Sequence, residues 1–128
     1  MKNEFTLTVT LPASAKDIYK AWLSTEGHSA MTGSAAKVDG RVNGAFTAWE
    51  GYIWGTFLEL LENKKIVQAW RTSEFPEDAE DSHVEVILEE QKGNTKLTLI
   101  HTQVPPGQDS YKKGWKDFYF KPMKEYFK

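Results

Sequence analysis

The stretch "QDSYKKGWKDFYFKPMKEYFK", residues 108–128, decides the fold that we predict for this chain. Helical spacing gathers its apolar residues into one wide face, made of Trp115, Phe118, Tyr119, Pro122 and Tyr126 and widened by Phe120, Met123 and Phe127. An isolated helix would not carry so much aromatic area, so this face must lie against a large apolar surface. We therefore expect a long C-terminal helix, beginning near Gln108, that the rest of the chain covers.

The first third of the chain predicts one strand followed by two short helices. Residues 4–11 alternate apolar and polar side chains, as a half-buried strand does, and Pro12 ends the run. Ser14 is placed to cap a first helix, with Asp17 three residues on as a short capping box. A second helix is expected within residues 24–33.

Beyond residue 36 the sequence predicts an antiparallel meander. Short turn dipeptides separate β-rich runs, at Asn43–Gly44, Glu50–Gly51, Asn63–Lys64 and Gly93–Asn94. The acidic stretch at residues 74–82, "EFPEDAEDS", is expected to be a solvated loop between two strands. The predicted fold is thus α+β, with six or seven antiparallel strands curved around the C-terminal helix, in one domain that spans residues 1–128.

The turn positions also predict which side chains share a face of the sheet. A two-residue turn at Glu50–Gly51 puts Trp49, Tyr52 and Trp54 together on one face. The turns at 63–64 and 93–94 predict four further pairs, which are Phe57 with Trp70, Leu61 with Ile66, Leu88 with Leu99 and Val86 with His101. The alternation alone leaves open which face is the inner one.

Composition and motifs argue against several classes of function. The 16 basic and 18 acidic residues give a formal charge of −2, so we expect neither a nucleic acid nor a membrane as partner. The absence of cysteine and of a signal-like apolar run favours a cytoplasmic protein. The spacing of His28, His83 and His101 fits no metal motif, and no nucleophile elbow, Walker loop or dinucleotide fingerprint occurs, so we expect no metal, no cofactor and no catalytic residues.

A set of motifs spread over most of the chain resembles the activator of heat-shock-protein-90 ATPase homologue-like (AHSA-like) family, within the START-like helix-grip superfamily. The motifs are "GAF" at 44–46, "EGYIWGTF" at 50–57, "KIVQAWR" at 65–71, "FP" at 75–76, "TKL" at 95–97, "VP" at 104–105 and "GWKDFYFKPMKEYF" at 114–127. The resemblance implies a helix-grip fold. The eukaryotic co-chaperones of this family also carry an N-terminal domain, to which none of these motifs belongs.

The resemblance also favours one face of the sheet as the inner one. The positions characteristic of the family correspond here to Phe46, Gly55, Phe57, Ile66 and Trp70, which share a predicted face. We therefore expect a ligand cavity lined by Phe46, Phe57, Trp70, His101, Trp115 and Tyr119. Trp49, Tyr52 and Trp54 would then form an outer patch, either as a partner surface or as rings partly covered by a loop.

Polar residues near the expected cavity have two interpretations each. An inward His101 could transfer a proton or bind a ligand, but a hydrogen-bonded core histidine is the more common case. Glu59 is placed inward with Gln68, and a carboxylate that reaches the rim into water is favoured over a buried acid. The lysines of the last helix form a solvated face or meet an acidic partner.

Three functions follow from these features. The favoured one is non-enzymatic binding of a heat-shock-90-type chaperone, with a stress-related role. The second is a carrier or sensor of a small apolar ligand held in the cavity. A small cyclase or hydrolase is the weakest, because the sequence offers no paired acid and base.

Overall fold

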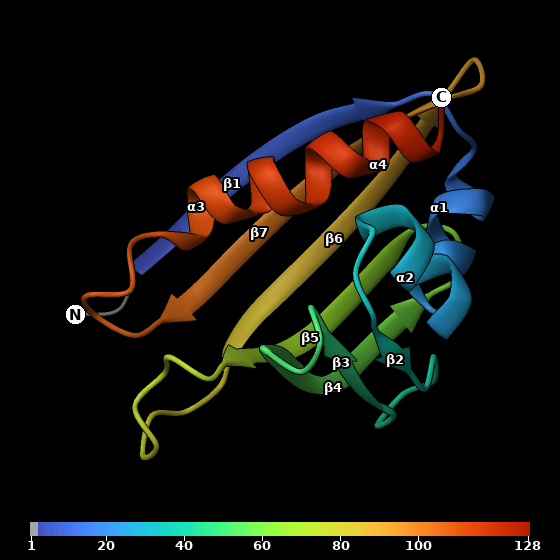
Figure 1. Ribbon diagram of the computed structural model, residues 1–128. Helices are drawn as coiled ribbons and strands as arrows, with labels where there is room; N and C mark the ends of the chain where they lie inside the picture. The colour runs from blue at the N-terminus through green and yellow to red at the C-terminus, as the bar shows by residue number, and fades with distance from the viewer. Residues whose placement is uncertain (1–2) are drawn as a thin grey trace.

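The computed structural model describes residues 3–128, in which seven strands form one antiparallel sheet curved around a C-terminal helix (Figure 1). The strands are β1 (Asn3–Leu11), β2 (Lys37–Val38), β3 (Ala45–Ala48), β4 (Ile53–Leu61), β5 (Lys65–Thr72), β6 (Ser82–Gln91) and β7 (Asn94–Val104). Their order across the sheet is β1-β7-β6-β5-β4-β3-β2, so apart from the placement of β1 each strand lies beside its neighbour in sequence. The predicted α+β helix-grip fold is confirmed.

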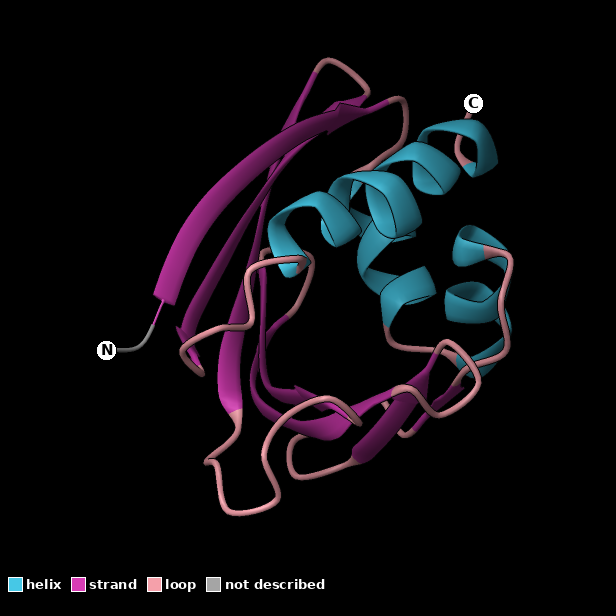
Figure 2. Ribbon diagram, turned by 60° about the vertical axis from the view of Figure 1, so that its left-hand side comes forward, coloured by secondary structure: helices cyan, strands magenta, loops and turns pink. Residues whose placement is uncertain are grey.

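Two short helices follow the first strand, as the sequence predicts. They are α1 (Ala15–Trp22) and α2 (Thr25–Thr32). The Ser14 side chain accepts a hydrogen bond from the backbone N–H of Asp17, and Gly33 ends α2 in the left-handed conformation. Figure 2 shows these helices and the C-terminal helix together on the concave side of the sheet.

The C-terminal helix begins at Tyr111, three residues later than predicted, and contains a π-helical segment. Its parts are α3 (Tyr111–Trp115), η1 (Lys116–Phe120) and α4 (Lys121–Tyr126). The N–H of Lys121 donates to the carbonyl of Lys116, five residues earlier. Pro122 explains the wider turn, because it has no N–H for the carbonyl of Phe118 and its ring crowds that carbonyl.

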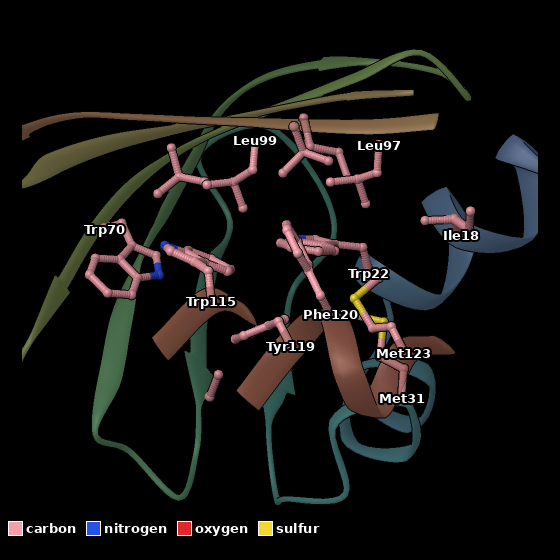
Figure 3. Close-up of a cluster of buried hydrophobic side chains, with 14 of the residues drawn as sticks. Ile18, Trp22, Met31, Trp70, Leu97, Leu99, Trp115, Tyr119, Phe120 and Met123 are labelled. Atoms are coloured by element: carbon pink, nitrogen blue, oxygen red, sulfur yellow. The ribbon is translucent and has the colours of Figure 1, made fainter. Parts of the chain in front are cut away.

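The π-helical segment changes which side chains of the helix point inward. Trp115, Tyr119, Phe120 and Met123 are buried, while Phe118 remains 56% exposed. In Figure 3 the inward side chains lie below Leu97 and Leu99 of the sheet. The prediction that Phe118 and Tyr126 belong to the buried face is wrong, because one additional residue per turn rotates the face.

The registers of the hairpins differ in part from the predicted ones. Between β3 and β4 the predicted pairs occur, with Thr47 opposite Trp54. Between β4 and β5, however, Gly55 and not Phe57 lies opposite Trp70, and Leu61 lies opposite Lys65. The connection is longer than a two-residue turn, and a β-bulge between Phe57 and Glu59 adds one further residue of shift.

The bulge also corrects the position of Glu59. Because it inverts the alternation, Leu60 packs against the core and Glu59 is exposed. The Glu59 carboxylate lies 3.5 Å from the Lys65 ammonium group. Glu59 is therefore not a buried acid.

The β6–β7 hairpin shows the same kind of difference. Its turn is formed by Lys92 and Gly93, both with positive φ, and Val84 instead of Val86 lies opposite His101. Leu88 accordingly pairs with Leu97. The shift is two residues in β6–β7 and in the part of β4–β5 before the bulge, and an even shift leaves those side chains on their predicted face.

The inner face is the one that carries Phe46, Phe57, Ile66 and Trp70, all of which are buried. Trp70 is only 3% exposed and lies with its ring centroid 5.6 Å from that of Trp115, whereas Trp54 on the outer face is 38% exposed. The face assignment for these residues is confirmed.

Replacing Trp70 by Ala should therefore lower the free energy of unfolding by about 3–5 kcal/mol, since it removes a buried aromatic side chain from the core. Trp54→Ser should change it by less than about 1 kcal/mol, because this ring is partly in solvent. Urea denaturation of the two variants compares the losses directly. Similar losses in both would contradict the assignment of the inner face.

Candidate functional site

A pocket of about 730 Å³ opens between the β3–β4 hairpin and the C-terminal helix. Its walls are mainly aromatic, formed by Trp49, Tyr52, Trp70, Tyr111, Trp115, Phe118 and Tyr119 together with Ile53. Polar groups come from the helix and the loop before it, namely Asp109, Ser110, Lys113 and Asp117, and Gly114 completes the lining. This size and apolar character are typical of a small-molecule site.

Half of the cavity residues predicted from the sequence line this pocket. Trp70, Trp115 and Tyr119 do so. Phe46, Phe57 and His101 are instead buried in the packed core. These three residues do not line the pocket, so their role in ligand binding stays a prediction.

Trp49 is placed differently from the prediction. It lines the pocket with Trp70, and its ring packs edge-to-face on that of Phe118, with centroids 5.4 Å apart. The prediction that Trp49 shares the outer face with Trp54 is wrong, because Trp49 and Glu50 both have positive φ and the alternation of an extended strand does not hold there.

Tyr52 lies at the pocket as well, within a network of polar groups. Its hydroxyl donates to the Glu74 carboxylate, and burial, followed by this hydrogen bond, raises the pKa of Tyr52. Nearby, the Tyr111 hydroxyl donates to Gln108 Oε1 (2.8 Å) and lies 2.6 Å from Thr72 Oγ1. These bonds join the start of the helix to the end of β5.

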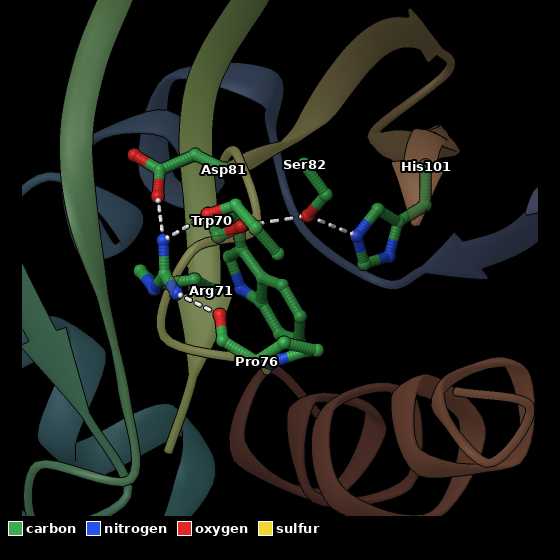
Figure 4. Close-up of polar contacts among 7 residues, drawn as sticks. Trp70, Arg71, Pro76, Asp81, Ser82 and His101 are labelled. Atoms are coloured by element: carbon green, nitrogen blue, oxygen red, sulfur yellow. Dashed lines mark hydrogen bonds and ion pairs between the residues drawn. The ribbon is translucent and has the colours of Figure 1, made fainter. Parts of the chain in front are cut away.

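Trp54 is the member of the predicted patch that faces outward. The Arg71 guanidinium lies over its ring, 5.9 Å from the centroid. The same guanidinium donates to the carbonyls of Ala79 and Pro76 and to the Asp81 carboxylate, as Figure 4 shows in part. Arg71 thus orders the acidic stretch that the sequence predicts as a solvated loop.

His101 is held as a neutral imidazole of one tautomer. Trp115 Nε1 can only donate, and it lies 3.1 Å from His101 Nδ1, so Nδ1 accepts and Nε2 carries the proton. Nε2 then donates to Ser82 Oγ (2.8 Å), which donates to the Trp70 carbonyl (2.6 Å; Figure 4). Burial lowers the pKa of His101 to about 3.

This arrangement resembles a serine–histidine dyad but does not activate the serine. A general base must accept the hydroxyl proton, whereas the nitrogen that faces Ser82 already carries one. Ser82 is also completely buried. The structure therefore supports the interpretation of His101 as a hydrogen-bonded core residue.

His28 makes a second, similar contact with the C-terminal helix. Its Nδ1 donates to the Trp22 carbonyl (3.0 Å), so its Nε2 accepts from the Tyr119 hydroxyl at 2.8 Å. Burial lowers the pKa of His28 to about 4. Two neutral histidines, one from α2 and one from β7, thus each accept a hydrogen bond from the helix.

The sequence gives little indication of several of these groups. Gln68, expected inward, accepts from Trp22 Nε1 (3.2 Å), but the bond itself has no local signature. Ser82, Arg71 and His28 act through contacts across 5 to 91 residues of sequence, which no motif records. Two residues inside the predicted helix disfavour a regular helix. Gly114 is a sequence signal for the pocket that it lines, and Pro122 is one for the π-helical segment before it.

Two further features bear on function. Within residues 3–128, no three His, Cys, Asp or Glu side chains are grouped so that they could hold a metal ion. In the same part of the chain, no helix has both the length and the apolar composition needed to cross a membrane.

Comparison with known proteins gives consistent relatives. Residues 12–128 match the family described as Activator of Hsp90 ATPase homolog 1-like protein. An uncharacterized protein of Schizosaccharomyces pombe is 33% identical over 92% of the chain, and the human activator of 90 kDa heat shock protein ATPase homolog 1 is 26% identical over 97%. The chain spans only 35% and 37% of the length of these two relatives.

A solved structure shares both fold and sequence. It is described as an HSP90 activator from Plasmodium falciparum, superposes with a TM-score of 0.81 and is 26% identical, covering 91% of this chain and 89% of its own.

The two buried histidines predict a pH dependence of stability. Their pKa values in the folded state, about 4 and about 3, lie below the ordinary 6.5, so the unfolded chain binds more protons at mildly acidic pH. Their contribution is complete above pH 6.5 and is lost as the pH falls below it. As the pH falls from 6.5 to 5, the loss of unfolding free energy per histidine should steepen from about 0.7 to about 1.4 kcal/mol per pH unit, because the unfolded imidazole goes from half to almost fully protonated.

Urea denaturation of His28→Gln over this range should show about half of the wild-type slope, since glutamine keeps an acceptor for Tyr119 but does not titrate. The exposed His83 offers a matched control, and His83→Gln should keep the full slope. An equal slope in His28→Gln and in the wild type would contradict the neutral, buried state of His28.

Proposed function

The chain belongs to the family of Activator of Hsp90 ATPase homolog 1-like proteins, and from this membership we propose that it is a non-enzymatic domain that binds an Hsp90-type chaperone. The observation that carries this proposal is the similarity along almost the whole chain to relatives named as activators of that ATPase. A cytoplasmic location and a role in the stress response would follow from such a partner.

The proposal covers binding rather than the full activity of the longer relatives. The chain corresponds to 37% of the length of the human activator, so the remaining part of that protein has no counterpart within these residues. Stimulation of the ATPase is a separate property that binding alone does not provide. We therefore propose the binding step and test it by titration.

The outer face of β4 is the surface that we propose for the partner. Trp54 is 38% exposed, and Leu58 and Leu61 of the same strand are 43% and 47% exposed. In Figure 2 the helices lie on the opposite, concave side of the sheet. Tryptophan and arginine carry much of the energy of protein interfaces, and Arg71 stacks on Trp54 here. This surface replaces the patch predicted from the sequence, from which Trp49 and Tyr52 turn toward the pocket.

The state of the buried histidines supports a function without covalent chemistry. His101 and His28 are neutral and have both ring nitrogens engaged in hydrogen bonds. Neither has a free nitrogen with which to transfer a proton. The enzyme hypothesis, the weakest from the sequence, gains no support from this geometry.

A second candidate function is the binding of a small apolar ligand. The pocket between the hairpin and the C-terminal helix favours it, because its volume and aromatic walls suit such a molecule. The two candidates use opposite sides of the sheet, so they can be tested independently.

Calorimetric titration of the purified chain with the Hsp90-type chaperone of its own organism, with and without nucleotide, tests the first candidate. Trp54→Ala should weaken binding by about 30-fold, since truncation of a central interface aromatic typically costs about 2 kcal/mol. Phe118→Ala, an exposed aromatic on the pocket side, is the matched control and should bind as the wild type does. The proposal fails if the wild type shows no binding at high micromolar concentration, and the assignment of the surface fails if Phe118→Ala is the weaker binder.

A further inference from the structure

Gly114 indicates that the sequence keeps the pocket free of a side chain at this position of the helix. It lies inside α3, where glycine destabilises a helix relative to alanine. A Cβ atom built on Gly114 would meet no atom within 4 Å, so packing does not demand a glycine there. Any larger residue would project into the pocket that Gly114 lines. A helix-weakening residue is therefore present where a side chain would reduce the pocket volume.

Trp49 occupies an unfavourable position at the edge of this pocket. Its Nε1 atom is buried and has no hydrogen-bond partner within residues 3–128. A buried N–H without an acceptor is costly, and so is positive φ at a bulky residue such as Trp49, which has φ 52°. The ring is held over the pocket by its edge-to-face contact with Phe118. A movement of this ring that brings Nε1 to an acceptor would remove the first of these penalties.

The charges around the pocket favour a neutral occupant. Lys113 and Asp109 contribute opposite charges to its lining, and the Asp117 carboxylate lies 3.5 Å from the Lys121 ammonium group. The formal charges of these four side chains sum to zero, so the lining as a whole favours neither an anion nor a cation. The aromatic rings of the wall offer flat apolar surfaces on which a ring-bearing molecule can pack.

We propose that the pocket binds a neutral, ring-bearing small molecule with a carbonyl-type oxygen, and that Trp49 recognises this oxygen through its Nε1–H after its ring leaves Phe118. The inference rests on the second candidate function, ligand binding, and is independent of the chaperone. Trp49 is thus both the cover of the pocket and its polar contact. Trp70, Trp115 and Tyr119 form the floor against which the rings of the ligand pack.

Two probes of the same shape test this chemistry, namely benzophenone, which has a carbonyl oxygen between two phenyl rings, and diphenylmethane, which lacks it. The ¹⁵N-labelled chain carries five tryptophans, and Trp49→Phe identifies the indole N–H resonance of Trp49. Benzophenone should bind about five- to tenfold more tightly than diphenylmethane and should shift the Trp49 indole resonance the most. In Trp49→Phe, which keeps a ring but has no N–H, the preference for benzophenone should disappear.

Two more variants control for the place of binding. Gly114→Leu should place a side chain in part of the pocket and weaken both probes at least tenfold, while Trp54→Phe on the outer face should change neither. Equal affinity of the two probes for the wild type would overturn the role of Trp49 and leave ligand binding intact. Absence of binding by either probe, or binding unchanged by Gly114→Leu, would overturn the pocket as a ligand site. The chaperone titration with Trp49→Phe stays informative in each case, since it uses the other side of the sheet.

Discussion

The position of the C-terminal helix depends on two hydrogen bonds that neutral imidazoles accept from it. Trp115 donates to His101 on β7, and Tyr119, one turn later, donates to His28 on α2. One bond ties the helix to the sheet and the other ties it to the helix pair, so together they fix both its rotation and its distance from the concave surface. Protonation of His101 would place a donor against the Trp115 N–H, and protonation of His28 would require the Tyr119 hydroxyl to accept instead of donate, so both bonds in their present form need a neutral imidazole.

This arrangement gives the concave and the convex side of the sheet different surfaces. On the concave side the helix contacts the sheet through side chains such as Trp115, and a pocket opens where the helix faces the β3–β4 hairpin. On the convex side Arg71 arranges the acidic loop and presents Trp54 to solvent. The same segment, residues 44–57, therefore contributes Trp49 to one side and Trp54 to the other.

The sequence predicts the helices, the strands and the buried face of the sheet well, because the alternation of side chains along a strand assigns the same face when the register is wrong by two residues. The predicted pairings of Trp70 in β4–β5 and of His101 in β6–β7 are wrong by two residues, yet Phe57, Trp70 and His101 remain on the inner face, since an even shift preserves the face. Alternation does not predict the face on which the side chains of Trp49 and Glu59 lie. The backbone of Trp49 is not extended, and Glu59 follows a bulge. The sequence predicts a cavity and three of its lining residues, Trp70, Trp115 and Tyr119, but it does not predict that Trp49 and Phe118 would form the opposite wall.

The π-helical segment of the C-terminal helix lets the chain hold one additional residue without changing the buried face. It inserts this residue between the half of the helix that walls the pocket and the half that ends the chain. Trp115 and Met123 are eight residues apart, which in a regular α-helix would separate them by about 80° around the axis, yet both are buried. Loss of a single residue from 116–120 would bring them to about 20° in a regular α-helix, so both could still point into the core. The wider turn therefore does for eight residues what a regular helix does for seven.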